Sequence, residues 1–191
     1  MKRNILFLLS VLFVLAGCSA STPLMKTYEP ETPPDIINAD ESAIIFLRPE
    51  KLGYAIQSPV AEIIDGDAQF VAIVSYNTKF IYKTTPGKHY FVVAGETGDV
   101  LEANLDAGKI YYVRISPRMG TWKARFVFDP VINLSAPGFI KNVQEASWYT
   151  NTDEGFKWFS DNKRSFIDKY SASQDEIKIL KPEFGVETPI R

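Results

Sequence analysis

The sequence offers almost no thiol or imidazole chemistry, because its 191 residues include one cysteine, Cys18, and one histidine, His89. A single cysteine cannot close a disulfide within its own chain, and one cysteine with one histidine falls short of the four ligands of a structural zinc site. We therefore expect no internal disulfide, no metal centre and no bound cofactor.

An excess of positive charge is missing as well. The chain carries 21 lysines and arginines against 23 aspartates and glutamates, which gives a formal net charge of −2. Proteins that bind nucleic acids usually expose a basic surface, since contacts to phosphate dominate their affinity. The composition therefore argues against a nucleic acid as partner.

The chain also lacks an apolar run long enough to cross a membrane. The longest one, residues 5–15, is interrupted only by Ser10. As a helix it would span about 17 Å, whereas the hydrocarbon core of a bilayer is about 30 Å thick. Lys2 and Arg3 precede the run and small residues follow it, which is the layout of a secretory signal peptide. We predict that residues 1–17 form this peptide.

The end of the predicted signal peptide, Leu15-Ala16-Gly17-Cys18, resembles the lipobox of bacterial lipoproteins at all four positions. The resemblance implies cleavage between Gly17 and Cys18, a diacylglycerol group on the Cys18 thiol, and a further acyl chain such as palmitate on the new amino terminus. Several acyl chains make a permanent anchor, since each buried methylene contributes about 0.8 kcal/mol. The alternative is an ordinary secretory signal with an incidental cysteine.

The residues after Cys18 bear on which membrane holds the anchor. In lipoproteins of Gram-negative bacteria, an aspartate directly after the lipidated cysteine tends to retain the protein in the inner membrane. Ser19 and Ala20 follow here. The resemblance therefore implies the outer membrane, with the domain facing the periplasm and exposure at the cell surface as the alternative.

The segment at residues 18–41 is rich in Ser, Thr, Pro and acidic residues. Its four prolines deny it a continuous helix and favour extended chain. We predict a flexible spacer that holds the folded domain off the lipid surface. A strand that docks on the domain is an alternative for residues 35–37.

Residues 42–130 alternate between β-prone runs and turn signals such as Asp65-Gly66-Asp67 and Pro86-Gly87. The intervals are too short for crossover helices, so we predict a mainly β domain, an antiparallel β-sandwich of seven or eight strands. In the last run, Trp122, Phe126 and Phe128 share one face, which alternation predicts to be buried. The predicted strands are residues 43–48, 60–64, 70–75, 78–84, 88–94, 100–105, 109–116 and 122–128.

Apolar residues change to helical spacing after Pro130, first around residues 138–146 and again in residues 152–170. Thr152, followed by Asp153 and Glu154, is typical of a helix start. We predict a helical appendage over residues 131–181 that packs on the sandwich, one further edge strand at residues 176–181, and a loose tail at residues 182–191.

Three short motifs resemble a family. They are Ala-x-Ile-Phe-x-Arg-Pro at residues 43–49, Thr-x-Pro-Gly-Lys-His-Tyr at residues 84–90 and Asp-Ala-Gly-Lys-x-Tyr-Tyr-Val-Arg at residues 106–114. Together they are similar to a domain of unknown function in many Gram-negative lipoproteins, which looks like the small PEGA and transthyretin-like β-sandwiches. The resemblance covers about residues 42–116. It implies a fold and transfers no catalytic residue.

Catalytic candidates are few. His89 follows a Pro-Gly-Lys turn without a nucleophile motif nearby, so we interpret it as a structural residue of the sheet. The carboxylates fall in turn-rich segments and are interpreted as solvated. A glycan-acting hydrolase with Asp99 and Glu102 at its centre is the alternative, because glycosidases use two carboxyl groups. The full set is Asp65, Asp67, Glu96, Asp99, Glu102 and Asp106.

Aromatic and basic side chains are the candidates for partner binding. Tyr111 and Tyr112 are adjacent in a predicted strand, so one ring should lie near the surface, and Trp148 and Trp158 lie in the helical part. Arg125 belongs to a predicted basic outer face together with Arg114, Arg118 and Lys123.

The sequence as a whole predicts a non-enzymatic, lipid-anchored envelope module. Its expected partners are the membrane, through acyl chains on Cys18, and an envelope protein or cell-wall component. A hydrolase, or a carrier of small apolar molecules with a cavity inside the sandwich, are the alternatives. The oligomeric state stays open.

Overall fold

The computed structural model describes residues 23–32 and 34–190, and every structural statement below refers to these ranges. The predicted signal peptide and the predicted lipidation site, Gly17 and Cys18, lie outside them. Among the described residues, no helix combines the length and the apolar character needed to cross a bilayer.

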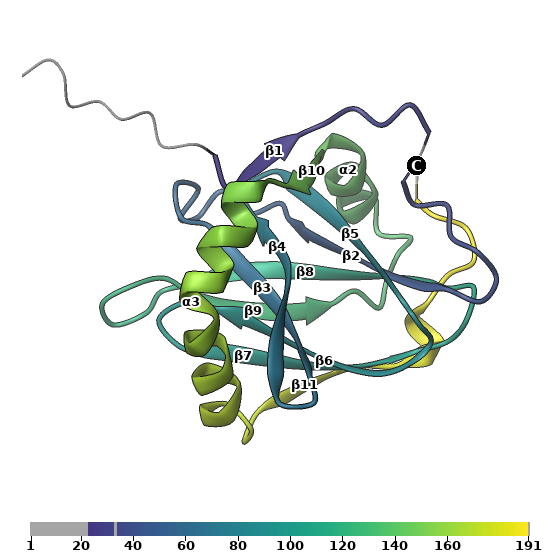
Figure 1. The fold of residues 1–191 in the computed structure, drawn as a ribbon. Coiled ribbons are helices and arrows are strands. Elements are labelled where there is room, and N and C mark those ends of the chain that lie inside the picture. The colour runs from purple at the N-terminus through teal and green to yellow at the C-terminus, as the bar shows by residue number, and fades with distance from the viewer. Residues whose placement is uncertain (1–22, 33, 191) are drawn as a thin grey trace, which may run out of the picture.

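The described chain is mainly β, with two sheets packed face to face as a sandwich (Figure 1). The six-stranded sheet has the order β1 (Met25–Thr27), β10 (Ser147–Asn151), β5 (Thr78–Thr84), β2 (Ser42–Arg48), β8 (Ile110–Arg118) and β9 (Arg125–Pro130). The five-stranded sheet has the order β11 (Ile177–Leu180), β7 (Gly98–Leu105), β6 (Gly87–Ala94), β3 (Ser58–Ile64) and β4 (Asp67–Val74).

Apolar side chains from the inner faces of both sheets fill the space between them. Phe46 of β2 meets Phe91 of β6 edge to face, with ring centroids 5.5 Å apart, and also packs against Phe128 of β9 at 5.9 Å. Such pairs contribute about 1 kcal/mol beyond the burial of their area. This aromatic centre joins the two sheets into one core.

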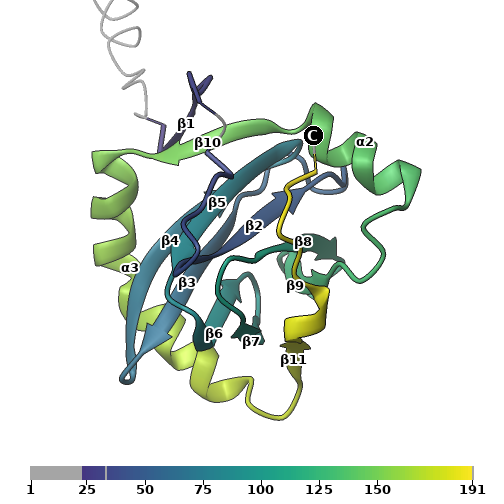
Figure 2. The ribbon, with the colours of Figure 1, turned by 90° about the vertical axis from the view of Figure 1, so that its right-hand side faces the viewer.

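Two helices cover the outer faces of the sandwich, and Figure 2 shows them on opposite sides of the sheets. Helix α2 (Pro137–Glu145) packs Phe139 and Val143 on the six-stranded sheet. Helix α3 (Asp153–Ala172) packs Phe159 and Phe166 on the five-stranded sheet. The six-stranded sheet is thus covered on both faces around β2, which explains why β2 has no exposed residue along its length.

The prediction of purely antiparallel sheets is wrong, because both sheets are mixed. Strand β2 runs parallel to β8, β5 to β10, and β7 to β11. A parallel pair needs a crossover, which we expected only from helices. The chain between β2 and β8 forms β3, β4, β6 and β7, which belong to the opposite sheet. These strands therefore form part of the crossover that connects the parallel strands β2 and β8.

Trp122 does not lie on the buried face of a strand, as alternation predicted. Strand β9 begins only at Arg125, and the side chain of Trp122 is 90% exposed. The backbone amides of residues 121–123 are bonded to the carboxylate of Glu96 and so are not available to a strand ladder.

The segments predicted as spacer, appendage and tail are more integrated than expected. Strand β1, within residues 18–41, pairs with β10, and β10 and β11 place parts of residues 131–181 in the two sheets. Residues 35–37 form no strand, but Ile37 packs on the core. In the predicted tail, η2 (Pro182–Phe184) is followed by Val186, which bonds to Ile110 through the backbone.

Two local predictions are confirmed. Thr152 caps α3, since its hydroxyl accepts a hydrogen bond from the amide of Gly155 at 3.1 Å, and Asp153 and Glu154 occupy the first turn. Strand β11 forms one edge of the five-stranded sheet.

Candidate functional site: an apolar groove beside helix α3

Two loops at one end of the sandwich expose large apolar side chains. The first, residues 49–57, joins β2 to β3, and the second, residues 119–124, joins β8 to β9; both project at the left of Figure 1. Trp122 is 90% exposed and Met119 is 84% exposed. We call the five exposed side chains the apolar tip: Leu52, Tyr54, Ile56, Met119 and Trp122.

A buried arginine holds the first loop. The guanidinium of Arg48, at the end of β2, donates hydrogen bonds to the carbonyls of Leu52 (3.0 Å), Gly53 (2.7 Å) and Ile56. It also donates to the Ser58 hydroxyl (3.2 Å) and lies over the Phe126 ring. Burial lowers the pKa of Arg48 from its ordinary value. The Arg48 guanidinium thus binds the backbone carbonyls on the inner side of the first loop, and the apolar side chains of this loop point to solvent.

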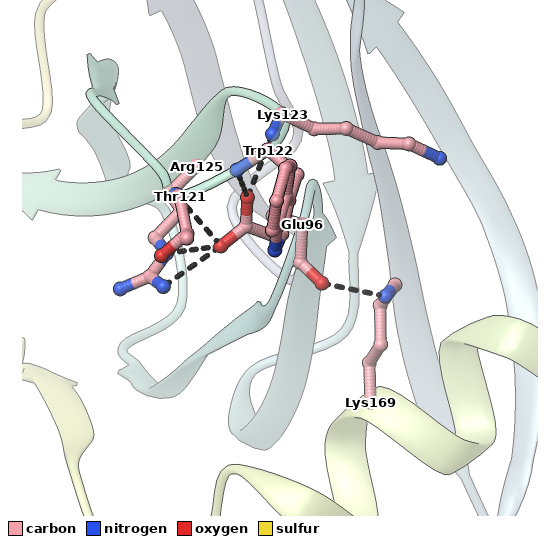
Figure 3. Close-up of polar contacts among 6 residues, drawn as sticks. All are labelled: Glu96, Thr121, Trp122, Lys123, Arg125 and Lys169. Carbon is pink, nitrogen blue, oxygen red and sulfur yellow. Dashed lines mark hydrogen bonds and ion pairs between the residues drawn. The ribbon is translucent and has the colours of Figure 1, made fainter.

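A glutamate holds the second loop by the opposite arrangement (Figure 3). The carboxylate of Glu96 accepts hydrogen bonds from the backbone amides of Thr121 (3.0 Å), Trp122 (2.6 Å) and Lys123 (2.7 Å). Arg125 donates to the same carboxylate through Nε (3.1 Å) and Nη2 (2.8 Å). These donors, the Lys123 and Trp122 amides first, lower the pKa of Glu96 to about 2.

A groove of about 600 Å³ runs between the second loop and α3. One wall is the helix, through Trp158, Asn162, Ser165, Phe166 and Lys169, and Phe126 lies at its base. A smaller cleft of about 350 Å³ continues between the two loops. Both hollows are lined by Ile56, Trp122, Lys123 and Ala124, so the apolar tip borders one continuous depression.

The structure distributes the predicted partner-binding residues unevenly. Trp158 lines the groove. Arg125 serves the second loop through its ion pair with Glu96 (2.8 Å) and does not line the groove. Trp148 lies elsewhere, half-buried on β10, with the ammonium of Lys79 4.5 Å from the centre of its ring.

Tyr111 is not a surface residue, so the prediction that one ring of the adjacent pair Tyr111 and Tyr112 lies near the surface is wrong. Its ring is fully buried, and its hydroxyl accepts a hydrogen bond from the amide of Asp106 at 2.8 Å. Tyr112 is buried as well. Both faces of β8 are covered, the inner one by the opposite sheet and the outer one by α2 and Ile190, which explains why neither ring reaches solvent.

His89 belongs to a polar cluster that the sequence did not reveal. Its Nδ1 lies 2.5 Å from Oε1 of Glu62, a buried carboxylate on β3, and its Nε2 lies 2.8 Å from the carbonyl of Thr85. Tyr82 donates its hydroxyl to the same carboxylate. The hydrogen bond to Glu62 raises the pKa of His89, while burial and Glu62 raise the pKa of Tyr82. The cluster links β3, β5 and β6 across the two sheets.

The two carboxylates of the hydrolase alternative lie apart. Asp99 and Glu102 are three residues apart on β7, so their side chains point to opposite faces of the sheet. Asp99 is buried and accepts a hydrogen bond from the Phe128 amide at 2.8 Å; burial raises its pKa. Glu102 pairs with Lys88 at 3.0 Å, which lowers the pKa of Glu102. Neither lines the groove.

The other carboxylate candidates lie in turns. Asp65 adopts a positive φ of 52° between β3 and β4, Asp67 pairs with Lys163 at 2.5 Å, and Asp106 pairs with Lys109 at 2.9 Å. In the part of the chain that the structure describes, no three histidine, cysteine, aspartate or glutamate side chains are grouped so as to hold a metal ion.

No protein-family model matches the chain, and no curated protein or solved structure shows significant similarity to it. The sequence indicated Trp158 as a surface aromatic residue, whereas strand alternation predicted Trp122 in the core, and Leu52, Ile56 and Met119 were not predicted. The available signal was a set of apolar residues inside segments otherwise composed of turn formers.

Proposed function

We propose that the chain is a lipid-anchored lipoprotein of the bacterial envelope, whose non-enzymatic β-sandwich binds another envelope component in the groove beside α3. The observation that carries the proposal is the position of the groove next to the start of the described chain. Thr152, the cap of α3, donates its hydroxyl to the carbonyls of Pro23 (2.9 Å) and Leu24 (2.8 Å). Trp158 follows six residues later, about 9 Å along the helix.

The lining of the groove supports binding in preference to hydrolysis. Its polar side chains are amides, a hydroxyl and two ammonium groups, from Gln57, Asn162, Ser165, Lys123 and Lys169. No carboxylate belongs to this lining within the described residues. A mixed apolar and cationic surface of this kind suits a protein or an anionic cell-wall or lipid group.

The location follows from the lipobox resemblance. Acyl chains on Cys18 would hold the protein in the outer membrane, with the domain in the periplasm, and exposure at the cell surface is the alternative orientation. Similarity to the lipoprotein domain of unknown function remains part of this proposal.

Site-specific photocrosslinking in living cells tests the binding role. A photoreactive residue at Asn162, inside the groove, should capture a discrete product, whereas the same residue at Arg164, exposed on α3 outside the groove, should not. Digestion of the product distinguishes a protein from glycan or lipid. Equal products from both positions, or no product from Asn162, Ser165 and Lys123 alike, would contradict the proposal.

A further inference from the structure

We infer that the apolar tip inserts into the interface of the same bilayer that holds the acyl chains. This inference rests on the proposed lipid anchor and names the partner that the tip meets.

The composition of the tip suits a membrane interface. Of the eleven large apolar side chains exposed in the described part of the chain, five belong to the tip. Tryptophan and tyrosine, here Trp122 and Tyr54, are the residues enriched where hydrocarbon meets headgroups. Leu52, Ile56 and Met119 supply the aliphatic surface that the acyl region accepts.

The charges beside the tip complement anionic headgroups. Lys51, Arg118 and Lys123 lie on or next to the two loops and are exposed. Of the nearby acids, Glu96 is paired with Arg125 and bonded to the second loop, whereas Glu50 accepts only a hydrogen bond from the neutral hydroxyl of Ser116 at 3.3 Å. Arg118 is paired with Asp129 at 3.6 Å, so Lys51 and Lys123 are the cations beside the tip that would meet anionic lipids.

The tether is short. Pro23, the first described residue, is five residues from Cys18, and five fully extended residues reach at most about 18 Å. Pro23 is bonded to the cap of α3, and the chain then enters β1. The residues after Pro23 therefore add nothing to the length of the tether. A domain held this close must turn one of its faces to the bilayer. The groove, which the tip borders, starts at Trp158, six residues after the helix cap that bonds the tether.

The loop backbones are already fixed in the geometry that exposes these side chains. Arg48 fixes the carbonyls of the first loop, and Glu96 fixes the amides of the second. Insertion into the bilayer would therefore require little further ordering of the two loops, so the loss of conformational entropy on binding would be small.

Quenching of tryptophan fluorescence by brominated lipids tests the inference. The mature lipidated protein would be reconstituted in vesicles of phosphatidylethanolamine and phosphatidylglycerol with brominated acyl chains. We expect quenching that Trp122→Phe removes and that Trp148→Phe, at the half-buried site on β10, leaves in place. Because Trp122 is 90% exposed, Trp122→Phe should fold normally.

Two outcomes would overturn the inference: no quenching by brominated chains, or equal quenching of the wild type and Trp122→Phe. If quenching is absent while Asn162 still crosslinks to a protein, the membrane inference fails and the proposed binding role of the groove survives. If mass spectrometry shows an unmodified Cys18, the proposed anchor fails, and the inference fails with it.

Discussion

Arg48 and Glu96 perform the same task with opposite charges. Each gathers the backbone groups of one loop, Arg48 the carbonyls and Glu96 the amides, and each leaves the apolar side chains of that loop in solvent. The sequence did not predict either role, because both depend on where a distant loop returns. Arg48 belongs to the predicted strand at residues 43–48. Glu96 belongs to a predicted turn, where a glutamate is usually exposed to solvent.

Replacing Glu96 by glutamine should loosen the second loop. A neutral amide oxygen is a weaker acceptor, and it cannot form the ion pair with Arg125. Hydrogen exchange should accelerate at the amides of residues 121–123, and Glu31→Gln, at an exposed position, serves as the control. Unchanged exchange in Glu96→Gln would show that the carboxylate does not hold the loop.

The same carboxylate should contribute to acid sensitivity. The pKa of Glu96 is depressed to about 2 in the folded protein, below its ordinary value of 4.5. Its contribution to stability is therefore complete above pH 4.5 and is lost as the pH falls toward 2. Urea unfolding between pH 3 and pH 6 should show a smaller decrease in stability for Glu96→Gln than for the wild type. An identical decrease would contradict the assignment.

Replacing Arg48 by methionine should lower the free energy of unfolding by about 3 kcal/mol, because several buried hydrogen bonds to a charged group are lost. Arg164→Met is the matched control, since this exposed arginine forms a surface i,i+4 pair with Asp168 and its replacement should cost under about 0.5 kcal/mol. Urea denaturation measures both. Equal losses would mean that the buried contacts of Arg48 contribute little.

The titration of His89 can be followed by NMR without overlap from other histidines, because the chain has one histidine. The hydrogen bond to Glu62 raises its folded pKa above the ordinary 6.5, so its stabilising contribution is present below pH 6.5 and declines as the pH rises through the folded pKa. NMR should report a pKa above 6.5 that decreases in Glu62→Gln. A value at or below 6.5 in the wild type would contradict the cluster.

At the scale of elements, local patterns predicted most strands but not their partners. The runs around residues 43–48, 78–84 and 88–94 match β2, β5 and β6 closely, since alternation and turn residues are local signals. The parallel β2–β8 pair could not be predicted this way, because it joins residues more than sixty positions apart. The burial of Tyr111 follows from that pairing.

Helix α3 and strand β1 depend on each other at Gly155. An added Cβ there would lie 2.2 Å from the carbonyl oxygen of Leu24. Glycine to alanine normally stabilises a helix by up to about 1 kcal/mol, but Gly155→Ala should destabilise this protein and accelerate amide exchange in β1. Thermal unfolding and hydrogen exchange measure the two effects.

Gly138→Ala in α2 is the control for that substitution, because no heavy atom outside its immediate neighbours lies within 4 Å of the added Cβ. It should leave β1 unaffected and raise stability slightly. If Gly155→Ala raised stability as well, the docking of residues 23–27 against α3 would be wrong.

At the scale of the whole molecule, the candidate site could be predicted only in fragments. Its walls come from α3, the β6–β7 turn and two loops that are separated by more than sixty residues. Trp158 was named because aromatic residues are common interface anchors, whereas Met119 and Leu52 become visible as a surface only after folding. The proposed amino-terminal anchor is a different case, since its prediction depends only on four contiguous residues, 15–18, that resemble a lipobox.

The proposed anchor and the proposed site combine in one account, in which a short tether would place an apolar face against its own membrane. Intact mass spectrometry of the protein purified from the membrane fraction tests this most directly. The account predicts a chain that begins at Cys18 and carries the added mass of a diacylglycerol group and an acyl chain. A mature chain that begins elsewhere, or one with an unmodified thiol at Cys18, would contradict it.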